Sequence, residues 1–468
     1  MRYLRFKNKN TVIPACPFRV RRAKALLRHS FSEGTAGIRK LLSFLVIFLI
    51  TMSSSFAQLP QPAKPQSGAI LLKGGIAHLG NGKVIQNSLI GFDEGEITMV
   101  GDATRSKIEV AGYTVIDITG QHVYPGFILP NSSIGLEEVS ALRATRDARE
   151  TGQLKPHIRS LVAYNTDSKI PPTLRYNGIL IAETTPMGGR ISGTSSVMNL
   201  EGWNWEDAVL KTDMGVHMSW PSRMGGHFDF ATFTFIREPN KKYDSQVAEL
   251  GSFFKDAKSY NETGIKERNL KLEAMEGLFA GAKTLYIRVG SAKEIVESVR
   301  FAQEYGVQKI VILAGTDALD VAPFLAENKI PVVLPNVHSL PGSDEVVELP
   351  YELAGLLTKA GVMVTLSHNG MLARARNLPF YAGTAAAYGL GKEEAVQLIT
   401  LNAAKILGID SEVGSLEEGK RATLFVSKGD ALDMMTNNLT HAYINGKTIQ
   451  LEGEQQALFK QYSDKYSE

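Results

Sequence analysis

An alternation of strand-like and helix-like segments runs through the second half of the chain and limits what it can fold into. From residue 283 onward, short apolar runs rich in β-branched residues are each followed by a stretch of helical character. Ile295, Val299 and Ala302, for example, recur at the spacing of one helical face. The strands of the four predicted strand–helix units are 284–289, 309–314, 330–334 and 362–366. Four such units in a row predict an α/β fold, the second half of a (β/α)8 TIM-type barrel.

Two strand-rich segments flank this region. Residues 69–124 contain short strands separated by turns, with a hairpin signal at Asn81-Gly82, and the end of the chain repeats the pattern with Asn445-Gly446. We expect these two segments to share one small composite β-sandwich domain around an inserted barrel. For the first half of the barrel the sequence predicts strands at 124–129 and 179–184, and it assigns no strand within residues 200–265.

The first 57 residues have the plan of a secretory signal peptide. They carry eleven Lys and Arg residues against one acidic residue, which leaves a net charge of −7 on the remainder and argues against a nucleic-acid partner. Arg39-Lys40 precede the apolar run 41–50, and Ser55-Phe56-Ala57 supply a small-x-small cleavage site. A membrane anchor is the alternative, but the run is well short of the roughly 20 residues that span a bilayer. Arg21-Arg22 offer a weaker twin-arginine interpretation.

Cysteine usage fits the predicted export. The single cysteine, Cys16, lies in the leader, so the mature chain has neither a disulfide nor a thiol nucleophile. We therefore expect a bacterial periplasmic or extracellular protein, with no transmembrane span once the leader is cleaved. A Pro-rich tether, residues 59–66, would follow the cleavage site.

Two passages resemble a known family. The first is DITGQHVYPGFI at 117–128, and the second is AVQLITLNAAKIL at 395–407 followed by GSLEEGK at 414–420. Together they resemble the amidohydrolase superfamily, in particular its imidazolonepropionase-like branch. The resemblance implies a distorted metallo-hydrolase barrel and a hydrolase of carbon–nitrogen bonds other than peptide bonds. It also suggests these boundaries: signal peptide 1–57, sandwich 58–124, barrel 125–410 and sandwich again 411–468.

The resemblance also implies a Zn²⁺-type ion, which lowers the pKa of a bound water. Its ligands would be a His-x-His pair on strand 1, one His each on strands 5 and 6, and an Asp on strand 8. None of the nine histidines forms a His-x-His pair. A guanidinium among these positions is hostile to a cation, so we expect no metal and no other cofactor. The ligand positions fall on Asn131, Ser133, Arg288, Ala314, and His368 or Asn369.

These residues should still gather at the carboxyl ends of the barrel strands, where this fold binds ligands. One interpretation is a pocket for a polar or anionic small molecule, with Arg288 as its fork-shaped contact. The other is that Arg288 fills the vacated metal space and pairs with an internal acid. Arg190 lies in a Gly-rich loop, 188–196, that either holds an anion or makes a tight connection.

Further residues have both a functional and a structural interpretation. His338 and His368 are the catalytic candidates and would form a two-His-plus-carboxylate site if they met at the barrel mouth, or else they are ordinary loop and core histidines. The charged run 143–150 is either a substrate-facing loop or a solvated helix face. The segment Trp203-Asn204-Trp205 indicates packing or an interface rather than a cofactor site.

Three functions are compatible with these patterns. The leading hypothesis is an exported ligand-binding or accessory protein, a pseudoenzyme without the usual metal centre, that forms a homo-oligomer or pairs with a related active amidohydrolase. The alternative is an active hydrolase of cyclic amides or small peptides with an unusual or absent metal. The third is a structural subunit of a periplasmic assembly.

Overall fold

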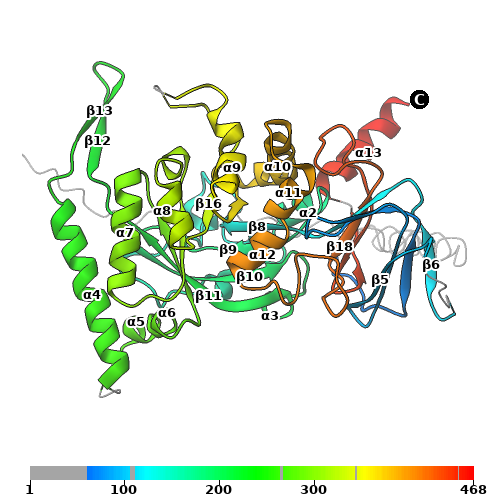
Figure 1. Ribbon diagram of the computed structural model, residues 1–468, viewed down its shortest axis with the longest axis horizontal. Helices are drawn as coiled ribbons and strands as arrows, with labels where there is room; N and C mark the ends of the chain where they lie inside the picture. Colours follow the sequence, from blue (N-terminus) through cyan, green and yellow to red (C-terminus); the bar gives the residue numbers. More distant parts are fainter. Residues whose placement is uncertain (1–60, 106–110, 264–266, 343–344, 452, 468) are drawn as a thin grey trace, which may run out of the picture. The chain divides into compact units, whose positions relative to one another are not determined.

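The computed structural model describes residues 61–105, 111–263, 267–342, 345–451 and 453–467 (Figure 1). The fold below is that of the compact unit Pro62–Glu468. The predicted signal peptide, with Cys16, lies outside the described residues. Within the described ranges, no helix is long and apolar enough to cross a membrane.

Strands from both ends of the chain build the small β-domain. One sheet has the order β5-β4-β1-β6 and the other the order β20-β19-β18-β7-β2-β3. β7 pairs antiparallel with β18, so the two ends share one sheet, as the sequence predicts. The strands are β1 Ile70–Lys73, β2 Ile76–His78, β3 Val84–Ile85, β4 Ser88–Asp93, β5 Glu96–Asp102, β6 Thr114–Asp117, β7 His122–Pro125, β18 Leu424–Ser427, β19 Leu439–Ile444 and β20 Lys447–Thr448.

One glycine separates the small domain from the barrel. The strand predicted at 124–129 is in fact two strands: β7 belongs to the small domain and β8, Phe127–Ser132, begins the barrel. Gly126 lies between them, where an added Cβ would come within 2.9 Å of Thr423 and 3.0 Å of Leu180. The chain crosses between the domains here because this residue has no side chain.

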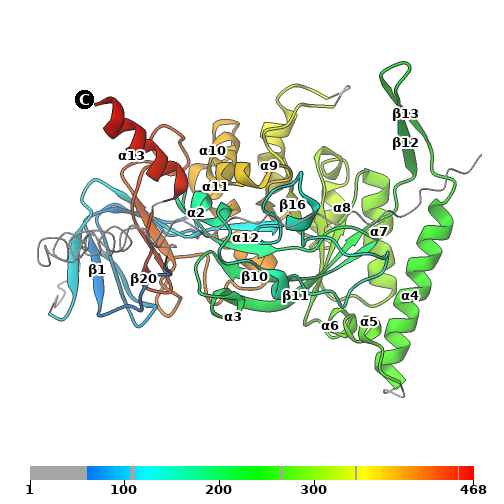
Figure 2. The same ribbon diagram turned by 180° about the vertical axis from the view of Figure 1, so that it is seen from behind.

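Eight strands form the nearly closed barrel sheet, in the order β17-β16-β15-β14-β11-β10-β9-β8. β10 is antiparallel to both of its neighbours, whereas a regular (β/α)8 barrel is all-parallel (Figure 2). The six residues between β9 and β10 are too few for a parallel crossover, which needs a dozen or more. The strands are β8, β9 Ile179–Thr184, β10 Ile191–Asn199, β11 Val209–Ser219, β14 Thr284–Arg288, β15 Ile310–Leu313, β16 Val332–Leu334 and β17 Val364–Leu366.

The four predicted strand–helix units are present and confirm the fold class. β14 to β17 are each followed by a helix, and residues 392–407 form two further helices separated by a turn at 399–400. The helices are α2 Ile170–Arg175, α3 Trp205–Ala208, α4 Tyr243–Thr263, α5 Leu270–Glu273, α6 Glu276–Phe279, α7 Ala292–Glu304, α8 Ala322–Glu327, α9 Leu349–Lys359, α10 Leu378–Ala387, α11 Lys392–Leu398, α12 Leu401–Leu407 and α13 Glu454–Tyr466. Short 3-10 turns are η1 Arg143–Thr145, η2 Ser160–Ala163, η3 Thr316–Ala318 and η4 Leu372–Asn377.

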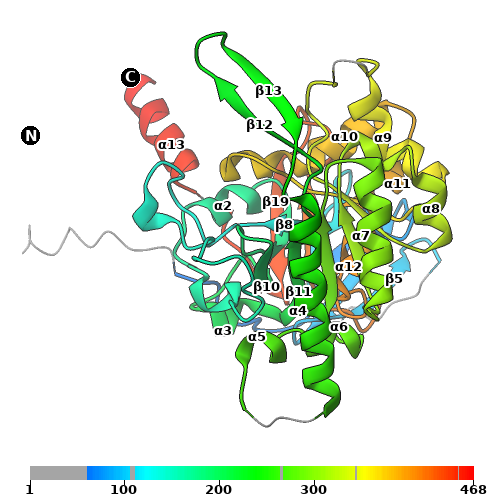
Figure 3. The same cartoon turned by 90° about the vertical axis from the view of Figure 1, so that its left-hand side faces the viewer.

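The segment without assigned strands, 200–265, contains barrel strand β11 and then a real excursion. Strands β12 Met224–Asp229 and β13 Thr234–Pro239 form a separate hairpin that leads into the 21-residue helix α4. The hairpin extends away from the neighbouring helices (Figure 3).

The barrel interior has an apolar lower layer. Ile128, Ile181, Val197 and Tyr286 pack there against Ile406 and Leu407 of α12. Alternate residues of a strand share a face. Glu183, Ser195 and Arg288 lie two residues from Ile181, Val197 and Tyr286, so they also face the interior. They form the next layer of the interior, one step nearer the carboxyl ends of the parallel strands. That step is where the metal of a metallo-hydrolase barrel is expected.

Candidate functional site

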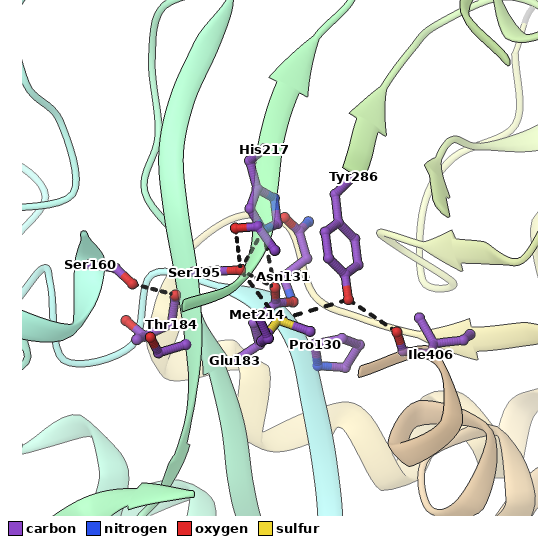
Figure 4. Close-up of polar contacts among 12 residues, drawn as sticks. Pro130, Asn131, Ser160, Glu183, Thr184, Ser195, Met214, His217, Tyr286 and Ile406 are labelled. Atoms are coloured by element: carbon purple, nitrogen blue, oxygen red, sulfur yellow. Dashed lines mark hydrogen bonds and ion pairs between the residues drawn. The ribbon is translucent and has the colours of Figure 1, made fainter. Parts of the chain in front are cut away.

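A fully buried polar cluster occupies the interior step above the apolar layer. Glu183 of β9, Ser195 of β10 and His217 of β11 are at most 2% exposed (Figure 4). Ser195 Oγ donates to Glu183 Oε1 at 2.7 Å, and His217 Nε2 lies 3.0 Å from the same oxygen. The other oxygen, Oε2, accepts the backbone N–H of Asn131 at 2.8 Å. The Glu183 carboxyl group is therefore held by three donors and closed off from solvent.

Ring stacking and hydrogen bonds together hold His217 in place. Its ring stacks on that of Tyr286, with centroids 4.7 Å apart and planes 4° from parallel. The hydrogen-bond network assigns the proton to Nε2, which lies near Glu183 and Ser195, while Nδ1 is buried without a partner among the described residues. Burial, followed by the charge of Glu183, raises the pKa of Tyr286 well above its usual value. Tyr286 thus stays protonated and donates to the carbonyl of Ile406 at 3.1 Å.

Asn131 connects this cluster to Arg288. Arg288 Nη2 donates to Asn131 Oδ1 at 3.2 Å, while the backbone of the same Asn131 reaches Glu183. Asn131 has a φ of 50°, a left-handed conformation that asparagine tolerates better than most residues. Arg288 therefore reaches an internal acid only through a neutral amide. The sequence offered two interpretations of Arg288, a contact for a bound anion or a partner of an internal acid. The observed arrangement falls between them.

The charge of Arg288 is incompletely balanced. No ion pair to Arg288 exists within the described ranges of the chain. Burial, and secondly the positive charge of Arg149, lower the pKa of its guanidinium. A part-buried cation with a neutral partner and a like charge nearby would be stabilised by an added anion.

The interior residues do not fit a Zn²⁺-type ion. Such an ion needs three or four N, O or S ligands around one point, and no group of three His, Cys, Asp or Glu in the described parts of the chain could hold a metal. In this layer of the interior, Glu183 supplies a carboxylate and His217 an imidazole. The Glu183 carboxylate already accepts three hydrogen bonds. The guanidinium of Arg288 lies on the strand that would supply the fifth-strand histidine.

The other predicted pocket residues lie at the same end of the barrel, but they make no hydrogen bond to Arg288 within the described residues. Ser133 and Ala314 are buried just beyond β8 and β15. Asn369 donates its backbone N–H to Pro335 at 2.8 Å, and the residue is exposed. Of the predicted set, the structure joins only Asn131 and Arg288 directly.

The rings of His338 and His368 both contact the ring of Tyr381, with centroids 4.7 Å and 5.9 Å apart. His368 Nδ1 accepts from the Tyr381 hydroxyl at 2.9 Å and its Nε2 donates to the carbonyl of Met371 at 3.1 Å. His338 Nε2 lies 2.7 Å from the hydroxyl of Thr384. Burial lowers the pKa of both histidines. His368 has both ring nitrogens engaged, and no carboxylate hydrogen-bonds to either ring in the described structure.

Of the predicted Gly-rich loop 188–196, only residues 188–190 lie in the tight connection between β9 and β10, and residues 191–196 are part of strand β10. A Cβ at Gly189 would lie 2.8 Å from the carbonyl of Gly152, so the loop packs closely on the segment beside it. Arg190 forms an ion pair with Glu249 of α4 at 3.2 Å. Through these contacts the loop packs against other parts of the protein.

The charged run 143–150 is not a helix face, so that interpretation is wrong. It is an irregular loop with one 3-10 turn, η1, and Arg149 forms an isolated bridge with Met187. In the Trp203–Trp205 segment, the side chain of Asn204 caps α3 and Trp205 packs on a buried cluster, while Trp203 is exposed.

Exposed glycines follow the barrel strand that carries Arg288 and the strand beside it. Gly290 and Gly315 follow β14 and β15, both are exposed, and a Cβ added to either would meet no atom within 4 Å. A side chain added at either glycine would thus enter open space, whereas Glu183 and Ser195 are enclosed.

Glu183 and Ser195 were not identified from the sequence. Glu183 did leave a signal, because it is the one acid in the otherwise apolar strand ILIAET. Ser195 left none, since β10 was not recognised as a strand.

Comparisons with known proteins agree with this architecture. A model of the amidohydrolase family matches residues 248–449. An imidazolonepropionase from Symbiobacterium thermophilum is 24% identical over 379 residues, which are 73% of this chain and 84% of that protein. An amidohydrolase from Thermotoga maritima MSB8 has a similar structure, with a TM-score of 0.71 at 24% identity, covering 81% of this chain and 99% of that one. A prolidase crystallised with N-methylphosphonate-L-proline aligns with a TM-score of 0.51 at 16% identity, covering 82% and 99%.

Proposed function

As this chain belongs to the amidohydrolase superfamily, we propose that it binds a small anionic molecule at the mouth of a barrel whose metal centre has been replaced. The observation that carries the proposal is Arg288, a part-buried guanidinium that donates to neutral Asn131. Fold alone does not establish activity in such a barrel, so the argument rests on the residues at its mouth.

The chemistry at the mouth favours a carboxylate or a similar anion. A guanidinium presents paired N–H donors that match the two oxygens of a carboxylate. Arg149 is exposed and close enough to Arg288 to lower its pKa, so a bound anion would relieve the repulsion between the two. Gly290 and Gly315, which follow β14 and β15, are exposed and have no side chain that would obstruct a ligand there.

The same residues favour binding over hydrolysis. Cleavage of a C–N bond requires a group that activates water within hydrogen-bond reach of the substrate. Glu183 is enclosed and satisfied by three donors, and His368 uses both ring nitrogens within the protein. The structure therefore supports a binding or accessory role. The proposed location, the periplasm or cell exterior, rests on the predicted signal peptide at 1–57.

Isothermal titration calorimetry of the purified protein with small mono- and dicarboxylates tests this function. A hydrogen bond to a charged group contributes about 1.5–3 kcal/mol, so Arg288→Gln should weaken binding about 10- to 100-fold. Gly290→Leu should also weaken binding by filling the open space. Arg237→Gln, on the exposed strand β13, is the matched control and should bind as the unaltered protein does. Equal affinities for Arg288→Gln and Arg237→Gln would exclude Arg288 as the ligand contact.

A further inference from the structure

A second cavity lies at the opposite end of the barrel from Arg288. It has a volume of about 540 Å³ and is lined by residues at the amino ends of β14, β15 and β16 together with α12. That volume lies within the roughly 300–1,000 Å³ of small-molecule sites. Its floor includes Met214 and Ile406, which also contact Tyr286 from the barrel interior.

The charged side chains that line the cavity are all positive. Its charged lining residues are the four lysines Lys211, Lys309, Lys329 and Lys405, and no Asp or Glu lines it. None of the four belongs to an ion pair within the described residues. Lys309, Lys329 and Lys405 are exposed and Lys211 is part-buried, and positive charges around one cavity attract an anion to it.

The four lysines come from separate elements that converge on this cavity. Lys211 is part-buried on β11 and donates to the carbonyl of Gly408, directly after α12. Lys309 precedes β15, Lys329 follows α8, and Lys405 lies on α12. Thr284, Gln303 and Asn328 add neutral polar groups, with Gln303 donating to Asn328 at 3.2 Å. Polar side chains thus accompany the positive charges around a partly apolar floor.

Lys329 has an unfavourable backbone conformation for a lysine. Its φ is 55°, in the left-handed region where glycine or asparagine is the usual residue. A lysine retained there carries a backbone cost that glycine would avoid. A role of the Lys329 charge in binding a ligand would explain why a residue with this backbone cost occupies the position.

We propose that this cavity binds a compact, multiply charged anion, a polyphosphate or a polycarboxylate, at a site distinct from the barrel mouth. Several positive charges without acidic partners suit a ligand that carries several negative charges. The proposal depends on lysines rather than on Arg288, so it stands or falls independently of the function proposed above.

Calorimetry with pyrophosphate and with citrate at low ionic strength tests the site. We expect saturable binding of one or both anions, and the preferred anion identifies the ligand class. Lys309→Gln/Lys329→Gly should bind at least tenfold more weakly. Lys329→Gly alone should weaken binding while its Tm is unchanged or raised, because glycine suits the left-handed backbone. That combination separates a lost ligand contact from a damaged fold.

Two controls give the test its specificity. Lys241→Gln/Lys460→Gln removes the same charge from exposed positions outside the cavity and should bind as the unaltered protein does. Arg288→Gln should also retain full affinity. The proposal is overturned if neither anion binds at millimolar concentration, if both double variants bind alike, or if Arg288→Gln abolishes binding.

Discussion

Asn131 links two ionisable groups of the barrel interior while remaining neutral itself. Its backbone N–H serves Glu183 and its side-chain oxygen serves Arg288. The resemblance to the amidohydrolase superfamily made Asn131 and Arg288 predictable as neighbours, because both fall where that family holds its metal ligands. Their contact with Glu183 was not predictable, since it depends on the register of strand β9 against β8.

Glu183 should matter more for stability than for ligand contact. Glu183→Gln replaces a hydrogen-bond acceptor by an amide whose NH₂ group would oppose the donors of Ser195 and His217. Breaking a buried charged network of this kind costs roughly 3 kcal/mol. Chemical denaturation should show that loss in the free energy of unfolding. Glu206→Gln, on the exposed surface of α3, should change stability by less than about 0.5 kcal/mol. Equal stabilities of the two variants would show that Glu183 is not a structural centre.

At the scale of whole elements, regular apolar periodicity decided what the sequence could predict. The units from β14 to α10 carry such patterns, and their boundaries were found to within a few residues. β10 carries none: ISGTSSVMN is small and polar, yet all nine residues are buried. Residues 154–159 run beside this strand, and Thr194 donates to the carbonyl of Pro156. Tertiary contacts, which no local pattern encodes, therefore make this segment a strand.

The crossing between the small domain and the barrel should be sensitive to one added carbon. Gly126→Ala places a Cβ within 2.9 Å of Thr423 and 3.0 Å of Leu180, and both neighbours are buried. Overpacking of this kind typically costs about 1–3 kcal/mol. Gly68→Ala, at an exposed site with no atom within 4 Å of the new Cβ, is the control. If urea denaturation shows no difference between the variants, the crossing is looser than the structure indicates.

For the molecule as a whole, histidines whose pKa is lowered in the folded protein should set the response to acid. Burial is the largest cause that lowers the pKa from 6.5 for five of them: His122, His157, His338, His368 and His441. A group whose folded-state pKa is lowered contributes stability above its unfolded pKa, and that stability is lost as the pH falls through the folded value.

Tm should therefore decrease as the pH is lowered from about 7 to 5, beginning near the ordinary histidine pKa of 6.5. His368→Asn removes one of these groups and should reduce the slope of Tm against pH. A Tm that stays level or rises toward pH 5 would contradict the lowered pKa of these histidines in the folded protein.

Arg288 and its partners stand where the superfamily holds its metal. Elemental analysis of the purified protein, before and after incubation with Zn²⁺ and desalting, tests this most directly. The structure predicts no stoichiometric divalent metal in either sample, because the donors of the interior step do not form a ligand set. One or two tightly held Zn, Mn or Ni ions per chain would contradict it.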